Sequence, residues 1–421
     1  MTTSEARIML ADLAVKDHPR ESMVSYRAAR RRESLRALAL ALPLLIFLLA
    51  TFVYPITSLL WRSVASDEVS TILPNLTRTL DDWDGSDLPG PVAYDALAQD
   101  IRRAVSDGTL VQAGRRLNNY DPGFRSLLLK TARQLERSPT GDAADILPRI
   151  DTRWSEHETW RLLKRAAARA TPDFLLTAVD LQTAPNGSVE QVPEHQRIYL
   201  AAFERTFVIS GTVTLLCLIL GYPVAYLLAT LPPRQSNRLM IFVIVPFWIS
   251  LLVRTTAWYV LLQPNGVVNS LFMNAGLTDS PIALMFNRTG VLIGMTHVLL
   301  PFMILANYAV MRGISPVYQR AAVSLGAHPV SAFFRIYVPQ TLPGIGTGTF
   351  LVFVLAVGYY ITPALLGGGG DEMISQLIAI QMERQLNWGL AAALSVYLVL
   401  FTLAAYFVFN HFVGVDRLRL G

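Results

Sequence analysis

Six long apolar stretches constrain this chain more than any other feature of its sequence. The first, residues 37–61, is long enough to cross a bilayer as a helix. It ends in Trp61-Arg62 instead of the small residues of a leader cleavage site, so we expect an uncleaved membrane helix. The composition agrees, with 52% hydrophobic and only 16% charged residues among 421. The other five predicted spans are Thr206–Leu231, Leu239–Leu262, Gly290–Met311, Leu342–Leu366 and Gly389–Phe412.

The positive charges of the connecting segments predict an orientation. The segment RAARRRESLR, residues 27–36, precedes the first span and favours a cytoplasmic tail over residues 1–36. Arginines recur in every second loop after it, whereas the alternate loops are richer in acids. We therefore expect a multi-pass membrane protein with both termini in the cytoplasm, the second tail being residues 414–421.

A long polar stretch, residues 62–205, separates the first span from the others. Charges of both signs alternate there with apolar residues at helical spacing, as in PGFRSLLLKTARQLERS and RWSEHETWRLLKRAAARA. The stretch has no metal-ligand or nucleophile pattern, so we expect no metal site. We predict a helical insertion on the extracytoplasmic side.

The predicted spans contain no aspartate or glutamate, which weighs against an ion-coupled carrier. Their one charge, Arg254, either extends toward an interface or makes a structural or gating contact within the bundle. Aromatic faces attract amine cations without buried carboxylates. The candidate substrate path is Trp248, Arg254, Tyr359, Tyr360 and Thr362, although helix packing or a place at the membrane interface explains any single aromatic residue more simply.

The segment between the fourth and fifth spans, residues 313–342, predicts two short helices on the cytoplasmic face. Ser315-Pro316 suits the start of the first helix, and Gly326 can end it in a left-handed conformation. A second helix would begin at Pro329 and be closed by the prolines within 339–343. Such a pair either receives force from a soluble partner or lies on the lipid surface as an amphipathic helix.

This segment resembles the signature of permease subunits of bacterial ABC importers that use a binding protein. That pattern is EAA, three residues, Gly, nine residues, Ile, any residue, Leu, Pro. The chain departs from it at Arg320, where the family has Glu, and at Val338, where it has Leu. The resemblance implies that the segment docks onto a cytoplasmic ATPase. The residues that it implicates in coupling are Arg320, Ala321, Ala322, Gly326, Ile336 and Pro339.

The stretches GYPVAYLLA, VPFWISLLVRTTAW and LVFVLAVGYYITPALLGG are similar to permeases of the spermidine/putrescine type. The resemblance implies an all-α, six-span, MetI-like permease fold with its core at residues 206–413. It also implies a second permease, a cytoplasmic ABC ATPase dimer and an extracytoplasmic solute-binding protein as partners, with a polyamine or related amine as substrate. ATP would be used by the ATPases, and this non-catalytic chain would bind no cofactor.

Two other classes of protein stay open on the sequence alone. A secondary carrier or channel would work without an ATPase. A membrane anchor would instead present residues 62–205 as a sensor or binding module. The GGGG run at residues 367–370 lacks the Lys-Ser/Thr of a phosphate-binding loop, so we expect only a flexible turn there.

Overall fold

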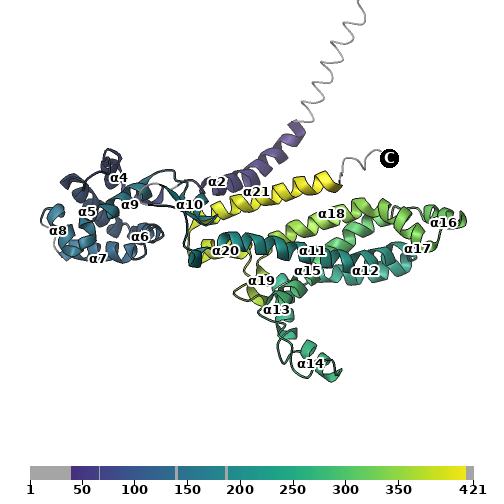
Figure 1. Ribbon diagram of the computed structural model, residues 1–421. Helices are drawn as coiled ribbons and strands as arrows, with labels where there is room; N and C mark the ends of the chain where they lie inside the picture. The colour runs from purple at the N-terminus through teal and green to yellow at the C-terminus, as the bar shows by residue number, and fades with distance from the viewer. Residues whose placement is uncertain (1–38, 66, 138–140, 185–187, 414–421) are drawn as a thin grey trace, which may run out of the picture. The chain divides into compact units, whose positions relative to one another are not determined.

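The computed structural model describes residues 39–65, 67–137, 141–184 and 188–413. This part of the chain is almost entirely helical, with one two-stranded sheet (Figure 1). It divides into two units, Met1–Leu60 and Trp61–Gly421, which are described separately below.

The described part of the first unit belongs to a helical run, Ala39–Trp61, of mean hydropathy 2.3. A π-helical turn, η1 (Leu49–Val53), interrupts it before α2 (Tyr54–Trp61). Pro55 lies just after that turn, and in a regular α-helix its ring would press on the carbonyl of Thr51. The wider π-turn removes this clash, so the helix continues.

The second unit begins with a helical bundle that has its own core. Trp154 and Trp160 are fully buried at its centre, and both indole N–H groups are satisfied. The indole nitrogen of Trp154 donates to Thr131 Oγ1 at 2.9 Å, and that of Trp160 donates to the Trp154 carbonyl at 2.9 Å. The bundle consists of α3 (Glu68–Ile72), α4 (Pro74–Asp81), α5 (Pro91–Ser106), α6 (Leu110–Asn118), α7 (Phe124–Arg137), α8 (Ala143–Ile150), η2 (Thr152–Ser155) and α9 (His157–Ala167).

A short connection leads from the bundle to the next long helix. It contains α10 (Asp173–Thr177), the antiparallel strands β1 (Leu181–Thr183) and β2 (Val189–Gln191), and η3 (Glu194–Gln196). The long helix, α11 (Tyr199–Thr230), begins seven residues before the start predicted from hydropathy. The extra turns carry Glu204 and Arg205, whose charges hid them from a search for apolar runs.

Three helices, α11, α15 (Arg288–Met311) and α18 (Val338–Val357), pack against one another in the membrane core (Figure 1). Glycines of α18 allow close approach: a Cβ on Gly344 would lie 3.0 Å from Val310 Cβ. The remaining elements are α12 (Pro233–Trp248), α13 (Leu251–Leu261), α14 (Val267–Asn274), α16 (Val317–Ser324), α17 (Pro329–Ala332), η4 (Phe333–Tyr337), α19 (Ile361–Leu366), α20 (Ile374–Glu383) and α21 (Trp388–Val413).

The expected six spans agree with the structure only if one bent pair counts as a span. Within the described residues, five helices are long and apolar enough to cross a membrane. The predicted span Leu239–Leu262 is instead α12 and α13, which meet at 98°. Ile249 and Ser250 are extended between them, and Pro246 removes a backbone donor from the last turn of α12. The predicted span is therefore a bent pair of helices and not one continuous helix.

The prediction that the prolines within 339–343 end the second short helix is wrong. The chain runs helically from Pro329 to Val357, through α17, η4 and α18. Pro339 follows the π-turn η4 by two residues, the same arrangement as at Pro55, so its ring meets no tight α-helical carbonyl. The second short helix of the cytoplasmic segment is thus the first part of the fifth long helix.

Candidate functional site

The segment between α15 and α18 forms a sharp corner. In α16, Ser315 Oγ accepts from the amide of Val317 at 3.4 Å, and Pro316 occupies the N-cap position, not the first helical position as expected. The next helix begins at Pro329, with His328 Nδ1 accepting from the amide of Val330 at 3.3 Å. The N-cap side chain therefore caps α17, whereas at α16 the hydroxyl of Ser315, one residue before the N-cap, accepts the first helical amide.

Gly326 makes the corner possible. Its φ of +94° is left-handed, which confirms the conformation predicted from the sequence. The amide of Ala327 donates to the carbonyl of Ala322 at 3.0 Å, and that of Gly326 donates to Val323 at 3.0 Å, as in a glycine-terminated helix. A Cβ on Gly326 would meet nothing within 4 Å, so the constraint is the backbone angle and not a lack of space.

The corner presents most of the predicted coupling residues to solvent. Arg320, Ala321, Gly326 and Pro339 are exposed, Ile336 is half-buried and Ala322 is buried. Within the described residues, Arg320 forms no ion pair.

Aromatic residues after the corner fix its far end to the core. Phe333 stacks on Tyr337, and both rings meet Tyr226 of α11 edge-on at 5.2 Å. Phe334 does not take part in this anchoring, and it is 62% exposed. It follows Phe333 directly on the helix, so it points about 100° away from the packed face.

A second group of predicted residues gathers after the α12–α13 bend. Thr255 Oγ1 and Thr362 Oγ1 lie 3.4 Å apart, which joins α13 to α19. Tyr359 and His297 lie within electrostatic reach of the Arg254 guanidinium. Nε and Nη1 of Arg254 are buried and have no hydrogen-bond partner among the described residues. A half-buried cation with two unpaired guanidinium nitrogens therefore sits on α13, a helix that carries no carboxylate of its own.

The two remaining candidates for the substrate path lie at its edges. Trp248 is 80% exposed at the end of α12, and Tyr360 is 39% exposed at the start of α19. Within the described part of the chain, neither makes a ring contact or side-chain hydrogen bond to the other candidates. The structure therefore brings Arg254, Tyr359 and Thr362 together and leaves these two aromatic residues apart.

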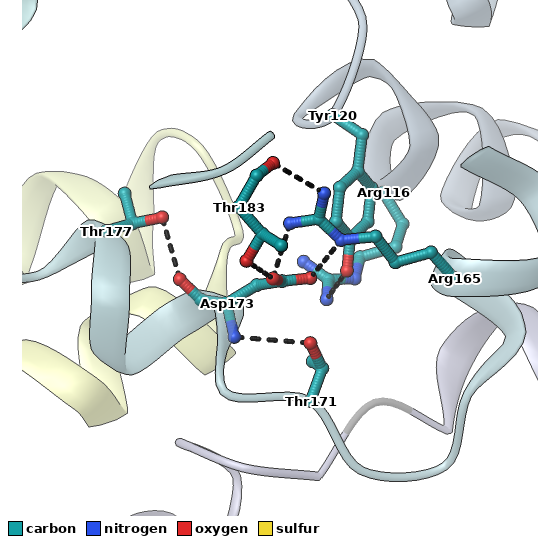
Figure 2. A network of polar contacts seen from close by, with 7 residues as sticks. All are labelled: Arg116, Tyr120, Arg165, Thr171, Asp173, Thr177 and Thr183. Atoms are coloured by element: carbon teal, nitrogen blue, oxygen red, sulfur yellow. Dashed lines mark hydrogen bonds and ion pairs between the residues drawn. The ribbon is translucent and has the colours of Figure 1, made fainter. Parts of the chain in front are cut away.

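A charged network that the sequence did not reveal joins the bundle to the connection (Figure 2). Arg165 of α9 binds the carboxylate of Asp173 of α10 through two nitrogens, one at 3.0 Å. Its Nη1 also donates to the carbonyl of Thr183 on β1 at 2.9 Å. Arg116 of α6 lies 3.9 Å from the ring centroid of Phe174 and donates to the hydroxyl of Tyr120 at 2.8 Å.

Burial and pairing shift the pKa values in this network. Burial lowers the pKa of the Arg116 guanidinium and raises that of the Tyr120 hydroxyl. Burial alone would raise the pKa of Asp173, but hydrogen bonds from Arg165 and Thr171 outweigh it and lower the value. Asp173 is thus an anion at neutral pH, and the network holds the bundle to the connection electrostatically.

Asp180 fixes the other end of the connection to α11. Its carboxylate accepts the amides of Ile198, Tyr199 and Leu200, at 2.8–3.1 Å. Its own φ is +57°, a conformation that aspartate tolerates better than most residues. The carboxylate stands 19 residues before Tyr199, the first residue of the helix it caps, so no local capping pattern could have indicated it.

Comparison with known proteins agrees with the sequence resemblance. Residues 218–414 match the family described as "Binding-protein-dependent transport system inner membrane component". The spermidine/putrescine transport system permease protein PotB of Escherichia coli (strain K12) is 36% identical over 187 residues, 44% of this chain and 68% of that protein. Its namesake in Haemophilus influenzae (strain ATCC 51907 / DSM 11121 / KW20 / Rd) is 30% identical over 246 residues, 56% of this chain and 86% of that protein.

A solved structure of a bacterial ABC transporter for the acidic polysaccharide alginate is more distant. It shares 19% identity and a TM-score of 0.43, covering 51% of this chain and 78% of its own. The assignment stands on the family match and on the two relatives. The chain therefore belongs to the binding-protein-dependent transport system inner membrane components, the non-catalytic, membrane-spanning permease subunits of ABC importers.

Proposed function

We propose that this chain is the permease subunit of a polyamine importer. It forms the translocation pore with a second permease and receives solute from an extracytoplasmic binding protein. A cytoplasmic ATPase dimer hydrolyses ATP and drives the change between outward-facing and inward-facing states. The insertion lies outside the membrane, and both termini lie in the cytoplasm.

The corner at Gly326 is the observation that carries this proposal. It presents the exposed residues Arg320 and Ala321 on α16. The helix that follows continues without a break through η4 into α18, which packs against both α11 and α15. A push on this corner therefore moves a helix of the membrane core directly, which is what ATPase coupling requires.

The substrate class rests on the relatives and on the chemistry of the predicted path. Both relatives described above are named as spermidine/putrescine permeases. Trp248 and Tyr360 expose aromatic faces that attract ammonium groups. Tyr359 and Thr362 add hydroxyl groups, and the guanidinium of Arg254 lies beside them as a gating contact.

The test is uptake of labelled putrescine and spermidine by cells that carry or lack this chain, with its native partners present. Deletion should abolish uptake, and the wild-type chain should restore it. A partner ATPase unable to hydrolyse ATP should abolish uptake as well. Uptake that persists with the inactive ATPase would identify an independent carrier instead.

Substitutions at the corner test the coupling role separately. Gly326→Pro should abolish uptake while the protein still inserts, because proline cannot adopt a positive φ. Gly326→Asn is the graded control, since asparagine tolerates the left-handed region and should retain most uptake. Gly369→Ala, at an exposed glycine with open space, controls for a glycine substitution elsewhere. Wild-type uptake by the Gly326→Pro chain would refute the coupling role.

A further inference from the structure

A cavity with charges of both signs opens at the starts of α11 and α15, and none of the predicted coupling or substrate-path residues lines it. Its volume is about 450 Å³. Three arginines, Arg197, Arg205 and Arg288, and two glutamates, Glu204 and Glu372, contribute to its lining. Nothing in the transport mechanism proposed above uses this cavity.

The arginines are held in place by short contacts. Arg205 donates from Nη1 to the carbonyl of Gly370 at 2.7 Å and from Nε to that of Ala201 at 3.2 Å. Arg288 binds Asp371 through Nε at 3.2 Å. Because guanidinium groups have five donors in a fixed plane, these contacts orient the arginines without using all their donors. Guanidinium groups bind phosphate through pairs of parallel N–H donors.

The two glutamates of the cavity, unlike its arginines, are not held by polar contacts with other described residues. Within the described residues, the carboxylates of Glu204 and Glu372 make no ion pair and accept no hydrogen bond, although both line the cavity. Glu204 is exposed and Glu372 is half-buried, so the cation of a ligand can reach both carboxylates. The cavity thus offers one set of groups for an anion and another for a cation.

The level of the cavity in the membrane restricts the ligand further. Arg205 directly precedes the apolar part of α11, and Arg288 is the first residue of α15. Both therefore lie where hydrocarbon gives way to polar headgroups. Further along α11, the helix face that carries Glu204 is apolar and exposed. Val208, Leu215 and Ile219 on this face are between 47% and 58% accessible.

We infer that this cavity binds the headgroup of an aminophospholipid. The phosphate lies against the arginines, the primary ammonium lies against Glu204 and Glu372, and the acyl chains follow the apolar face of α11. A lipid with phosphate alone would leave the two carboxylates unpaired. A quaternary ammonium would offer them no N–H donor.

The test uses the full chain with its partner subunits, delipidated and then incubated with phosphatidylethanolamine, phosphatidylglycerol or phosphatidylcholine. Native mass spectrometry measures the lipid retained. Phosphatidylethanolamine should be retained about tenfold better than the other two, a difference of roughly 1.4 kcal/mol. Equal retention of all three lipids, or retention of none, would overturn the inference.

Matched variants identify the groups responsible. Glu204→Gln with Glu372→Gln should erase the preference for phosphatidylethanolamine over phosphatidylglycerol, and the protein should still fold because neither carboxylate holds another residue. Glu383→Gln, an exposed carboxylate at the end of α20, is the control and should leave the preference intact. Inorganic phosphate is added as a competitor. Displacement of the lipid by millimolar phosphate would show a free-anion site and overturn the lipid assignment.

Discussion

Arg165 and Asp173 form a two-pronged ion pair that joins the last helix of the bundle to the connection before α11. The carboxylate is nearly buried, with its side chain 10% accessible, and Thr183 Oγ1 donates to it at 3.1 Å. Because Arg165 also holds the Thr183 carbonyl, three segments meet at this one pair (Figure 2). The rigidity of the connection therefore depends on a few charged contacts as well as on apolar packing.

Asp173→Asn should lower the stability of this junction. The amide retains the shape of the side chain but leaves Arg165 facing a neutral group, and a charged hydrogen bond contributes about 1.5–3 kcal/mol. Thermal unfolding of the full chain in detergent, followed by tryptophan fluorescence, measures the loss. Asp145→Asn, on the exposed side of α8, is the control and should have no effect. An unchanged melting temperature for Asp173→Asn would show that the pair contributes nothing.

The same pair predicts a dependence on pH. The folded-state pKa of Asp173 is below the ordinary value of 3.8, so the ionised carboxylate stabilises the folded chain at and above that value. The contribution disappears as pH falls through the lowered pKa. The gap in melting temperature between wild type and Asp173→Asn should therefore be constant from pH 7 to pH 5 and should close below 3.8. A gap that closes near neutral pH would assign the effect to another group.

The contrast between the corner and this junction shows what the sequence could predict. Gly326 lies between a helix that starts after Ser315-Pro316 and a helix that starts at Pro329. Glycine at the end of a helix commonly adopts a positive φ, so its left-handed conformation could be predicted from these neighbouring residues alone. Arg165 and Asp173 lie within residues 62–205, which contain 18 basic and 21 acidic residues. The sequence therefore does not show which basic residue pairs with which acidic one. The helix bends after Trp248 but continues through Pro339. Whether a proline bends or interrupts a helix depends on the backbone around it, and hydropathy carries no information about that.

Asp180→Ala should loosen the start of α11. The substitution removes the acceptor of three amides and places alanine at φ +57°, and losing such a cap costs about 1–2 kcal/mol. Asp180→Asn retains one oxygen acceptor and tolerates the angle, so it should lose less. Hydrogen exchange at the amides of residues 198–200 measures both effects in the full chain. Equal protection in wild type and Asp180→Ala would contradict the cap.

Gly344→Ala should weaken the packing of α18 against α15. An added Cβ would lie 3.0 Å from Val310 Cβ and 3.3 Å from the Cα of Asn307, and neither atom can move aside easily. Overpacking of this kind costs about 1–3 kcal/mol. Gly211→Ala on α11 is the matched control, because a Cβ there meets nothing within 4 Å and alanine favours the helix. Thermal unfolding should order the chains as Gly211→Ala, wild type and Gly344→Ala, from most to least stable.

Arg254→Leu separates a gating role from a structural one. Two of its guanidinium nitrogens are buried without partners among the described residues, and replacing an unpaired buried charge by an apolar side chain is neutral or stabilising. We therefore expect the melting temperature to hold or rise while polyamine uptake falls. Arg254→Lys, which retains a charge on a different donor geometry, should recover uptake only in part. If Arg254 instead only extends to the membrane interface, Arg254→Leu will transport at the wild-type rate. A lower melting temperature would show that the guanidinium is paired in the assembled importer.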